Sequence, residues 1–307
     1  MHHIMELRHL HYFLKIAETS SFTQAAAALR VTQPTLSHQI AQLEREIGAP
    51  LFDRIGRSIR LTEQGRIFRD YAQRALREIE TGCTAVSESE AMVHGQLKMG
   101  VFRSFGSSAL PAVLAGFHRD YPGVRVSVQQ MSLADMESTL IDGAIHLAIT
   151  TYVPPTSPQI LAEEIFTEPL VLGVAAHHPL ARRSAVELKD LDGVPLVLRA
   201  SGTPSRQLID ACFTARDVVP NVVIEMSSGD ATLATVRCSE LATICAARAL
   251  EGSPGLCAVR ILEPRLKRTG AILWHRTRYR IAAATLFAHM VKEAHALPIS
   301  GQRAAHG

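Results

Sequence analysis

The segment from residue 33 to residue 47 constrains the fold most, because it joins an apolar stripe to an unusual polar face. Leu36, Ile40, Leu43 and Ile47 recur every three or four residues, which predicts a helix with one buried side. Pro34 suits its first turn, and Gly48 can end it. The other faces carry hydrogen-bonding side chains with little charge, namely Gln33, Thr35, Ser37, His38, Gln39 and Gln42. Taken alone, such a face is usually just solvated.

Two shorter helices are predicted ahead of this segment. Apolar spacing predicts the first over residues 7–19, and Ser21 with Gln24 has the form of a capping box that begins the second. A tight turn at residues 30–32 then leads into the polar helix. This is the order of a helix-turn-helix, whose second helix lies in the major groove of DNA. Gln, Ser and Thr suit that helix because they donate and accept hydrogen bonds toward base edges.

A small β-hairpin, or wing, is predicted next. Two short strands with apolar edges flank residues 55–57, and Arg54, Arg57 and Arg60 place three positive charges on this hairpin. A surface arginine cluster is often only solvated. Beside a helix-turn-helix, contact with DNA phosphates is the better interpretation, because guanidinium is a planar donor group with a permanent charge.

A long helix without proline is predicted from residue 63 to about residue 92, with Thr62 as its N-cap. It carries an apolar seam, with charges of both signs on its flanks; the seam consists of Phe68, Ala72, Ala75, Ile79, Cys83 and Val86. So long a seam, with little sequence nearby to cover it, favours packing against a second copy of the chain. The alternative is that it packs on the chain's own C-terminal part.

From about residue 95, short apolar strands alternate with helices. The expected strands are 97–101, 124–128, 145–150, 170–175, 196–198, 222–225, 242–245 and 271–274, and a final helix is expected over 281–295. Alternation of this kind predicts an α/β architecture with mainly parallel sheets. The length of this part suits two small lobes of about 100 residues each.

Polar residues gather where several predicted strands end. In open α/β sheets, ligands bind beyond the carboxyl ends of the strands. The residues at these junctions are Arg103, Ser104, Ser132, Thr150, Arg199 and Thr203. Any single Ser or Thr among them is equally well explained as a helix cap. Together they predict an effector-binding cleft, and Arg103 and Arg199, if they point inward, favour an anionic ligand.

The charge balance excludes a chain that coats nucleic acid along its whole length. Its 32 Lys and Arg residues oppose 29 Asp and Glu residues, so DNA contact must come from a local concentration of charge and donors. No apolar run reaches the ~18–20 residues of a membrane span, and residues 1–6 do not resemble a signal peptide. We therefore expect a cytoplasmic protein without a membrane partner. The five cysteines form no C-x-x-C pair and are expected to be reduced and mostly buried, rather than disulfide-bonded or zinc-bound.

Enzyme activity is not expected, because the sequence contains no G-x-S-x-G, H-E-x-x-H, P-loop or G-x-G-x-x-G motif. We accordingly expect no catalytic residue, no metal site and no cofactor. The competing hypothesis is a cytoplasmic small-molecule binding protein related to solute-binding proteins, which the fold predicted for the C-terminal part allows. The predicted helix-turn-helix and the lack of a signal peptide disfavour that hypothesis.

The N-terminal residues resemble one family closely. The segments 10–13, 21–26, 32–37, 40–44, 48–54 and 61–65 resemble the LysR-type transcriptional regulators almost continuously. The later residues, including 121–122 and 177–180, resemble the same family more loosely. Within the family, the sequence is most similar to regulators of cyanate or aromatic-catabolism operons.

The resemblance implies a layout and an assembly. It implies a winged helix-turn-helix DNA-binding domain, a dimerising linker helix and an effector-binding domain like a type 2 periplasmic binding protein. These would span residues 5–62, 63–94 and 95–300, with lobe I at about 95–165 plus 269–300 and lobe II at about 166–268. It also implies a homodimer or homotetramer on interrupted, near-palindromic operator DNA, with effector binding that changes DNA bending.

The resemblance also assigns roles by position. The DNA contacts of the family fall on Thr23, Gln33, Pro34, Thr35, Ser37, His38, Gln39, Arg54 and Arg57. Ser104 falls where the family often places an effector-binding Ser or Thr. Arg103 beside it is bulkier than the family pattern, which implies either a different effector or an outward orientation for Arg103.

Overall fold

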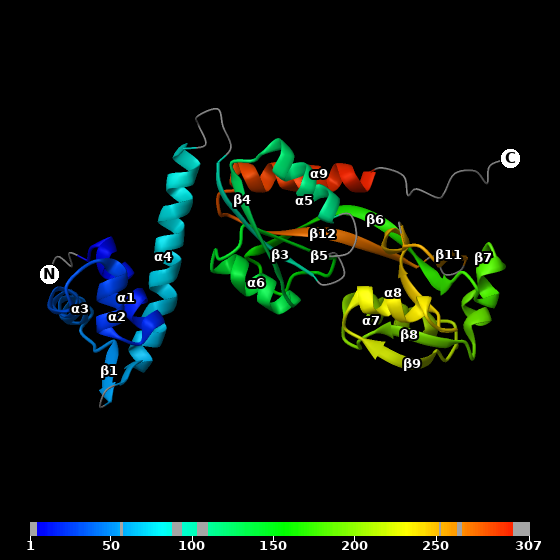
Figure 1. Cartoon of the computed structure of the whole chain (residues 1–307), viewed down its shortest axis with the longest axis horizontal. Coiled ribbons are helices and arrows are strands. Elements are labelled where there is room, and N and C mark those ends of the chain that lie inside the picture. Colours follow the sequence, from blue (N-terminus) through cyan, green and yellow to red (C-terminus); the bar gives the residue numbers. More distant parts are fainter. Residues whose placement is uncertain are drawn as a thin grey trace. The chain divides into compact units, whose positions relative to one another are not determined.

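A computed structural model describes residues 5–55, 58–87, 94–102, 110–251, 253–262 and 266–296 of the chain. The chain separates into two units, residues 1–89 and residues 90–307 (Figure 1). The separation falls inside the segment predicted as a linker. Each unit has its own hydrophobic core, so each is described by itself.

The N-terminal unit is a winged helix-turn-helix followed by a long helix. Its elements are α1 (Leu7–Thr19), α2 (Phe22–Leu29), α3 (Gln33–Ile47), β1 (Phe52–Ile55), β2 (Ser58–Leu61) and α4 (Glu63–Ser87). The predicted stripe of α3 is buried at Leu36, Ile40 and Leu43, where it packs with Phe13 and Ile16 of α1. β1 and β2 pair antiparallel and form the predicted wing. The continuation of α4 predicted beyond Ser87 lies outside the described residues.

The helices of this unit begin and end at local signals in the sequence. The hydroxyl of Ser21 accepts a hydrogen bond from the backbone N of Gln24 at 3.3 Å, and Thr32 caps α3 in the same way. The hydroxyl of Thr62 accepts from the backbone N of Gly65 at 2.9 Å at the start of α4. Gly48 ends α3 with φ +81°, a left-handed conformation that glycine adopts without strain. These caps explain why the bounds of three helices follow from the sequence.

The C-terminal unit is two-lobed, with helices packed on a mixed sheet. The elements centred on its first lobe are β3 (Gly95–Val101), α5 (Leu110–Asp120), β4 (Val124–Gln130), α6 (Leu133–Ile141), β5 (Leu147–Thr151), β12 (Lys267–His275) and α9 (Ala282–Ala296). The others are β6 (Ile160–Ala175), η1 (Pro179–Arg182), β7 (Ala185–Val186), η2 (Leu188–Leu191), β8 (Pro195–Arg199), α7 (Pro204–Thr214), β9 (Asn221–Met226), α8 (Gly229–Arg237), β10 (Thr243–Ala246), η3 (Ala247–Leu250) and β11 (Leu256–Ile261). The largest sheet has the order β4-β3-β5-β12-β6-β11-β7, and β10 also pairs with β6.

The prediction of mainly parallel sheets is wrong for the centre of this sheet. β3 runs parallel to β4 and β5, and β8 runs parallel to β9. β12 is antiparallel to both β5 and β6, and β10 and β11 are antiparallel to β6. β6 and β12 carry the chain from one lobe to the other and back, instead of alternating with helices (Figure 1). Leu170 and Leu172 of β6 accordingly lie in the core of the second lobe, and Ile272 and Trp274 of β12 lie in the core of the first.

A histidine between α6 and β5 makes the stability of this unit depend on pH. His146 Nδ1 accepts a hydrogen bond from the backbone N of Lys98 at 3.0 Å. Burial, with smaller contributions from the charges of Lys98 and Arg278, lowers the pKa of His146 from 6.5 to about 4. As the pH falls below 6.5, His146 therefore becomes protonated in the unfolded chain before it does in the folded chain. The free energy of unfolding decreases as a result until the pH reaches about 4.

We expect His146→Asn to remove most of this pH dependence, because the Asn amide oxygen can accept the same hydrogen bond and does not titrate. The stability at stake is about 3 kcal/mol, at 1.36 kcal/mol per pKa unit. Urea unfolding at several pH values, followed by the fluorescence of the single tryptophan, Trp274, measures it. The exposed residue His118 provides the matched control, His118→Asn. If the stability of His146→Asn depends on pH as strongly as that of the unmodified chain, His146 is not the cause of this pH dependence.

Candidate functional site

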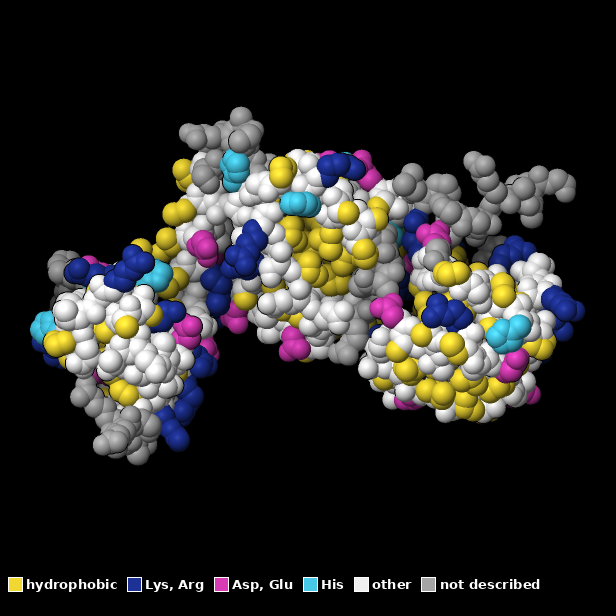
Figure 2. Space-filling model, in the orientation of Figure 1, with side chains coloured by type: hydrophobic (Ala, Val, Ile, Leu, Met, Phe, Trp, Pro, Cys, Tyr) yellow, Lys and Arg dark blue, Asp and Glu magenta, His cyan; other side chains and the backbone are white. Residues whose placement is uncertain are grey.

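The outer face of α3 carries six of the residues predicted to meet DNA, and α2 carries Thr23. Among these residues, Thr23, Gln33, Pro34, Thr35 and His38 are exposed, and Ser37 and Gln39 are half-buried. The amide nitrogen of Gln33 donates to the hydroxyl of Ser37 at 3.0 Å, so these two side chains lie together one turn apart. In the view of Figure 2, much of the surface of this unit is uncharged, with Lys and Arg side chains near its edges. The structure thus brings the predicted polar face together on one helix.

Gln39 has a different environment from the other polar residues of α3. Its Oε1 lies 2.7 Å from Nε2 of His9, a fully buried residue in the first turn of α1. Sequence reasoning missed His9. A histidine beside Leu10 fits the pattern of an ordinary helix turn, so no local signal distinguishes it.

The wing is present, but its arginines are only partly described. Arg54 lies in β1 with its backbone opposite Ile59 of β2. The side chain of Arg54 and the whole of Arg57 lie outside the described part of the chain. Arg60 is exposed on β2. The phosphate contacts predicted for Arg54 and Arg57 therefore remain predictions.

The second candidate site is a cavity of about 60 Å³ in the C-terminal unit. It lies where β8 ends and where α7 and α8 begin, beside β10. Its polar lining includes Arg199, Ser205, Thr232, Thr243 and Arg268; its other residues are Leu170, Gly229, Leu233, Ile244, Cys245, Ala246 and Ala249. Two arginines in a largely apolar wall suit a small anion with an apolar part.

Of the residues predicted for the effector, only Arg199 lines this cavity among those that the structure describes. Ser132 caps α6, where its hydroxyl accepts from the backbone N of Asp135 at 3.2 Å. Thr203 is the N-cap residue of α7 and donates to the carbonyl of Ala200 at 3.1 Å. Thr150 is fully buried in β5. Arg103 and Ser104 lie outside the described residues.

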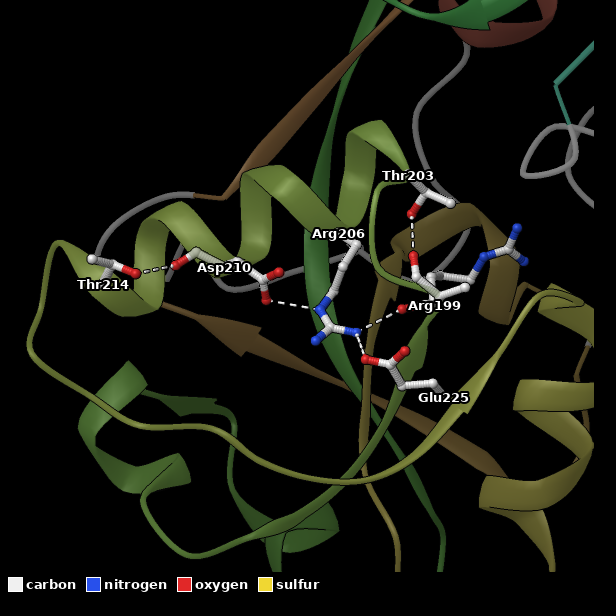
Figure 3. Close-up of polar contacts among 7 residues, drawn as sticks. Arg199, Thr203, Arg206, Asp210, Thr214 and Glu225 are labelled. Carbon is white, nitrogen blue, oxygen red and sulfur yellow. Dashed lines mark hydrogen bonds and ion pairs between the residues drawn. The ribbon is translucent and has the colours of Figure 1, made fainter. Parts of the chain in front are cut away.

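A buried arginine holds the end of β8 in place. Arg206 of α7 donates from Nη1 to the carbonyl of Arg199 at 2.8 Å and to Oε1 of Glu225 at 2.7 Å (Figure 3). Its Nε donates to Oδ1 of Asp210 at 2.8 Å. Burial opposes the charge of Arg206, but the hydrogen bonds to Asp210 and Glu225 outweigh it and raise its pKa. Arg206 therefore holds the backbone at Arg199, whose side chain points away from Arg206 (Figure 3) and lines the cavity.

The other arginine of the cavity belongs to a buried ion pair. Arg268 of β12 lies opposite Glu168 of β6, with 2.5 Å between Nη2 and Oε1 and both side chains nearly inaccessible to solvent. Glu168 offsets the charge of Arg268 and holds its guanidinium in the wall of the cavity. Burial raises the pKa of the Cys245 thiol, also in the lining, to about 12. That thiol stays protonated at neutral pH, and in this form it is a poor nucleophile and metal ligand.

The remaining features concern metals, membranes and cysteines. The described residues contain no group of three His, Cys, Asp or Glu side chains placed to hold a metal ion. Within the same residues, no helix is long and apolar enough to cross a membrane. The prediction of mostly buried cysteines is wrong, since Cys83 and Cys238 are exposed and the other three residues are half-buried, with the thiol of Cys245 on the buried side of its residue. Cys83 is exposed because the part of α4 that carries it has an uncovered seam.

Comparison with known proteins connects both units of the chain to one family. Residues 7–66 match the family described as "Bacterial regulatory helix-turn-helix protein, lysR family", and residues 90–296 match the "LysR substrate binding domain". A "Probable nitrogen assimilation transcriptional activator" of Synechococcus elongatus is 31% identical over 86% of this chain and 87% of its own length. An "Uncharacterized HTH-type transcriptional regulator YybE" of Bacillus subtilis is 28% identical over 94% of this chain and 98% of its own.

Solved structures agree in fold. Full-length CbnR, determined in complex with its target DNA, has a TM-score of 0.68 at 25% identity, with 94% of this chain and 100% of that chain covered. A full-length OxyR variant from Pseudomonas aeruginosa has a TM-score of 0.72 at 23% identity, over 95% of this chain and 96% of that chain. The resemblance to one branch of regulators stays a prediction. The two matched domains cover nearly the whole described chain in order, and the chain belongs to the LysR family of helix-turn-helix transcriptional regulators.

Proposed function

We propose that α3 reads operator DNA through its N-terminal half, and that the cavity of the C-terminal unit senses a small anionic effector. The observation that carries the first part is the polar face of α3, presented by a helix-turn-helix whose apolar stripe is fully used in its own core. Thr23, Gln33, Pro34, Thr35, Ser37, His38 and Gln39 form the proposed interface, with Arg54 and Arg57 on phosphates. Such a regulator acts where the DNA is, in the cytoplasm, and catalyses no reaction.

Replacing Gln33 and Ser37 by Ala tests the reading face. Because both side chains lie at the surface, we expect the fold to be unaffected and specific binding to weaken by about 1–3 kcal/mol for each hydrogen-bonded base that is no longer read. Gel-shift titrations on a DNA sequence selected by the full chain measure this. The exposed residue Arg45, farther along α3, provides the control variant Arg45→Ala. Unchanged specific binding in the double variant would refute the assignment of α3.

The effector proposal rests on Arg199, whose side chain lines the cavity and whose backbone is held by Arg206. A ligand that binds only the folded chain raises its melting temperature by mass action. We expect acetate, pyruvate or inorganic phosphate to raise the melting temperature of the full chain, and acetamide, the neutral counterpart of acetate, to leave it unchanged. Arg199→Gln should remove the shift, whereas Arg182→Gln, in η1 away from the lining, should keep it. An equal shift in both variants would exclude this cavity.

Self-association is the third part of the proposal. Hydrophobic side chains are exposed along α4 (Figure 2), among them Ile67, Tyr71, Ile79 and Val86, with 43–75% of their surface accessible. Of the predicted seam, Phe68 and Ala72 pack into the core of the N-terminal unit, whereas Ile79 and Val86 are exposed, and a second copy of the chain is the natural partner for this later part. We therefore propose a homodimer joined through α4, from which the tetramer implied by the resemblance is built.

A further inference from the structure

His9 is a polar side chain with no accessible surface, and two hydrogen bonds occupy its ring. Nδ1 lies 3.3 Å from the backbone N of Glu6, and Nε2 lies 2.7 Å from Oε1 of Gln39. The first contact is within the N-terminus of α1, and the second reaches across to α3. His9 therefore joins the start of one helix to a side chain of the helix proposed to read DNA.

This arrangement leaves only one orientation for the amide of Gln39. A backbone N–H can only donate, so Nδ1 of His9 must be the accepting nitrogen of a neutral ring. The ring proton then sits on Nε2, which must donate. Its partner on Gln39 must accept, so Oε1 faces His9 and the NH₂ group faces away. Gln33 is not held in this way, because its partner, the hydroxyl of Ser37, can both donate and accept.

The orientation of Gln39 decides what it can recognise. A glutamine that reads adenine uses both ends of its amide, with the oxygen accepting from N6 and the nitrogen donating to N7. His9 engages one of the two lone pairs of Oε1 and fixes this oxygen on the side of α1, so the NH₂ group is the end of the amide that faces away from His9. Donors fit the acceptor atoms of DNA, which are O6 and N7 of guanine, O4 of thymine and the phosphate oxygens.

We propose that His9 is a specificity-determining positioning residue, which fixes the amide of Gln39 with its NH₂ donors facing away from His9 and keeps its oxygen from turning toward a base donor such as N6 of adenine. This inference rests on the proposed function of α3 as the DNA-reading helix. Gln39 lies one turn after Thr35, on the flank of α3 that faces the start of α1, and it is half-buried. The contact it makes is therefore set by an internal residue that itself never touches DNA.

The experiment selects binding sites from a randomised DNA duplex pool with three full-length proteins: the unmodified chain, His9→Leu and His11→Leu. His9→Leu keeps the site filled and apolar but frees the Gln39 amide to turn over. We expect His9→Leu to accept adenine at the position that Gln39 contacts, and to leave the other positions unchanged. His11 is exposed on the same helix, so His11→Leu should select the same sequences as the unmodified chain.

A second variant keeps the test decisive if His9→Leu does not fold. Gln39→Glu retains an oxygen that accepts from His9 but has no N–H donor for DNA. We expect it to melt like the unmodified chain and to bind the selected DNA about five- to a hundredfold more weakly, the range for one missing hydrogen-bonded pair with a base. A decrease confined to one base position identifies a base acceptor. An equal decrease on all sequences, which the added negative charge alone can cause, would contradict a base contact by Gln39.

Two different failures are distinguishable. If the unmodified chain selects no preferred sequence, the proposed function of α3 is wrong, and the inference about His9 falls with it. If the unmodified chain selects a sequence, but Gln39→Glu binds it equally well, the donor role of Gln39 is overturned. A folded His9→Leu protein with unaltered base preferences and affinity would overturn the positioning role of His9 alone.

Discussion

Replacing Arg268 by Met is expected to destabilise the C-terminal unit by about 3–5 kcal/mol, the usual effect of removing one partner from a buried ion pair. Arg268 and Glu168 are 4% and 3% exposed, so the carboxylate of Glu168 would be left buried without its countercharge. The pair also joins β6 to β12 where both strands pass between the lobes. Urea unfolding followed by Trp274 fluorescence measures the decrease in stability.

The matched control replaces both partners by Met. Two apolar side chains of similar length remove both charges, and such replacements are often neutral or stabilising. The double variant should therefore unfold close to the unmodified chain, even though it contains one more substitution than Arg268→Met. If the two variants are destabilised equally, shape rather than charge determines the contribution of this pair, and the interpretation as an ion pair is wrong.

Leu36→Ala is expected to destabilise the N-terminal unit by up to about 5 kcal/mol, because the substitution leaves a cavity as well as removing apolar contacts. Leu36 is fully buried in the core that α3 shares with α1. Thermal unfolding followed by circular dichroism at about 222 nm measures the effect, because this unit is mainly helical and has no tryptophan.

The control for Leu36→Ala is a truncation on the exposed side of the same helix. Arg45→Ala should change stability by no more than about 0.5 kcal/mol, as surface substitutions usually do. DNA binding by Leu36→Ala should also fall at temperatures where the unit is partly unfolded and recover on cooling. If Leu36→Ala does not lower the unfolding temperature of the N-terminal unit, the apolar stripe of α3 is not part of its core.

The N-terminal unit was predictable because its signals are local. Ser21, Thr32 and Gly48 fix helix ends within one turn of chain, and the stripe of α3 repeats at a helical period. β6 was predicted only from residue 170 onward, although it begins at Ile160. Its first half carries Glu163 and Glu164, whose partners on the neighbouring strand come from far along the sequence. No local pattern could reveal that pairing.

The candidate sites show the same contrast. The polar face of α3 follows from spacing within one helix. The cavity brings together Arg199, Ser205, Thr232, Cys245 and Arg268 from five separate elements, and only strand register and helix packing place them side by side. The terminal Ser and Thr residues of strands were a weaker guide, since Ser132 serves as a helix cap and Thr150 is buried in its strand.

The path of the chain through β6 and β12 has a consequence for synthesis on the ribosome. The core of the first lobe unites Leu97 and Met99, made early, with Trp274 and Phe287, made near the end. Along the sequence, the residues of the second lobe lie between these two parts of the first lobe. The first lobe therefore cannot close until translation is almost complete, and its early strands must wait for β12 and α9. A polypeptide truncated before β12 would expose that unfinished core, which makes it a target for quality control rather than a smaller functional regulator.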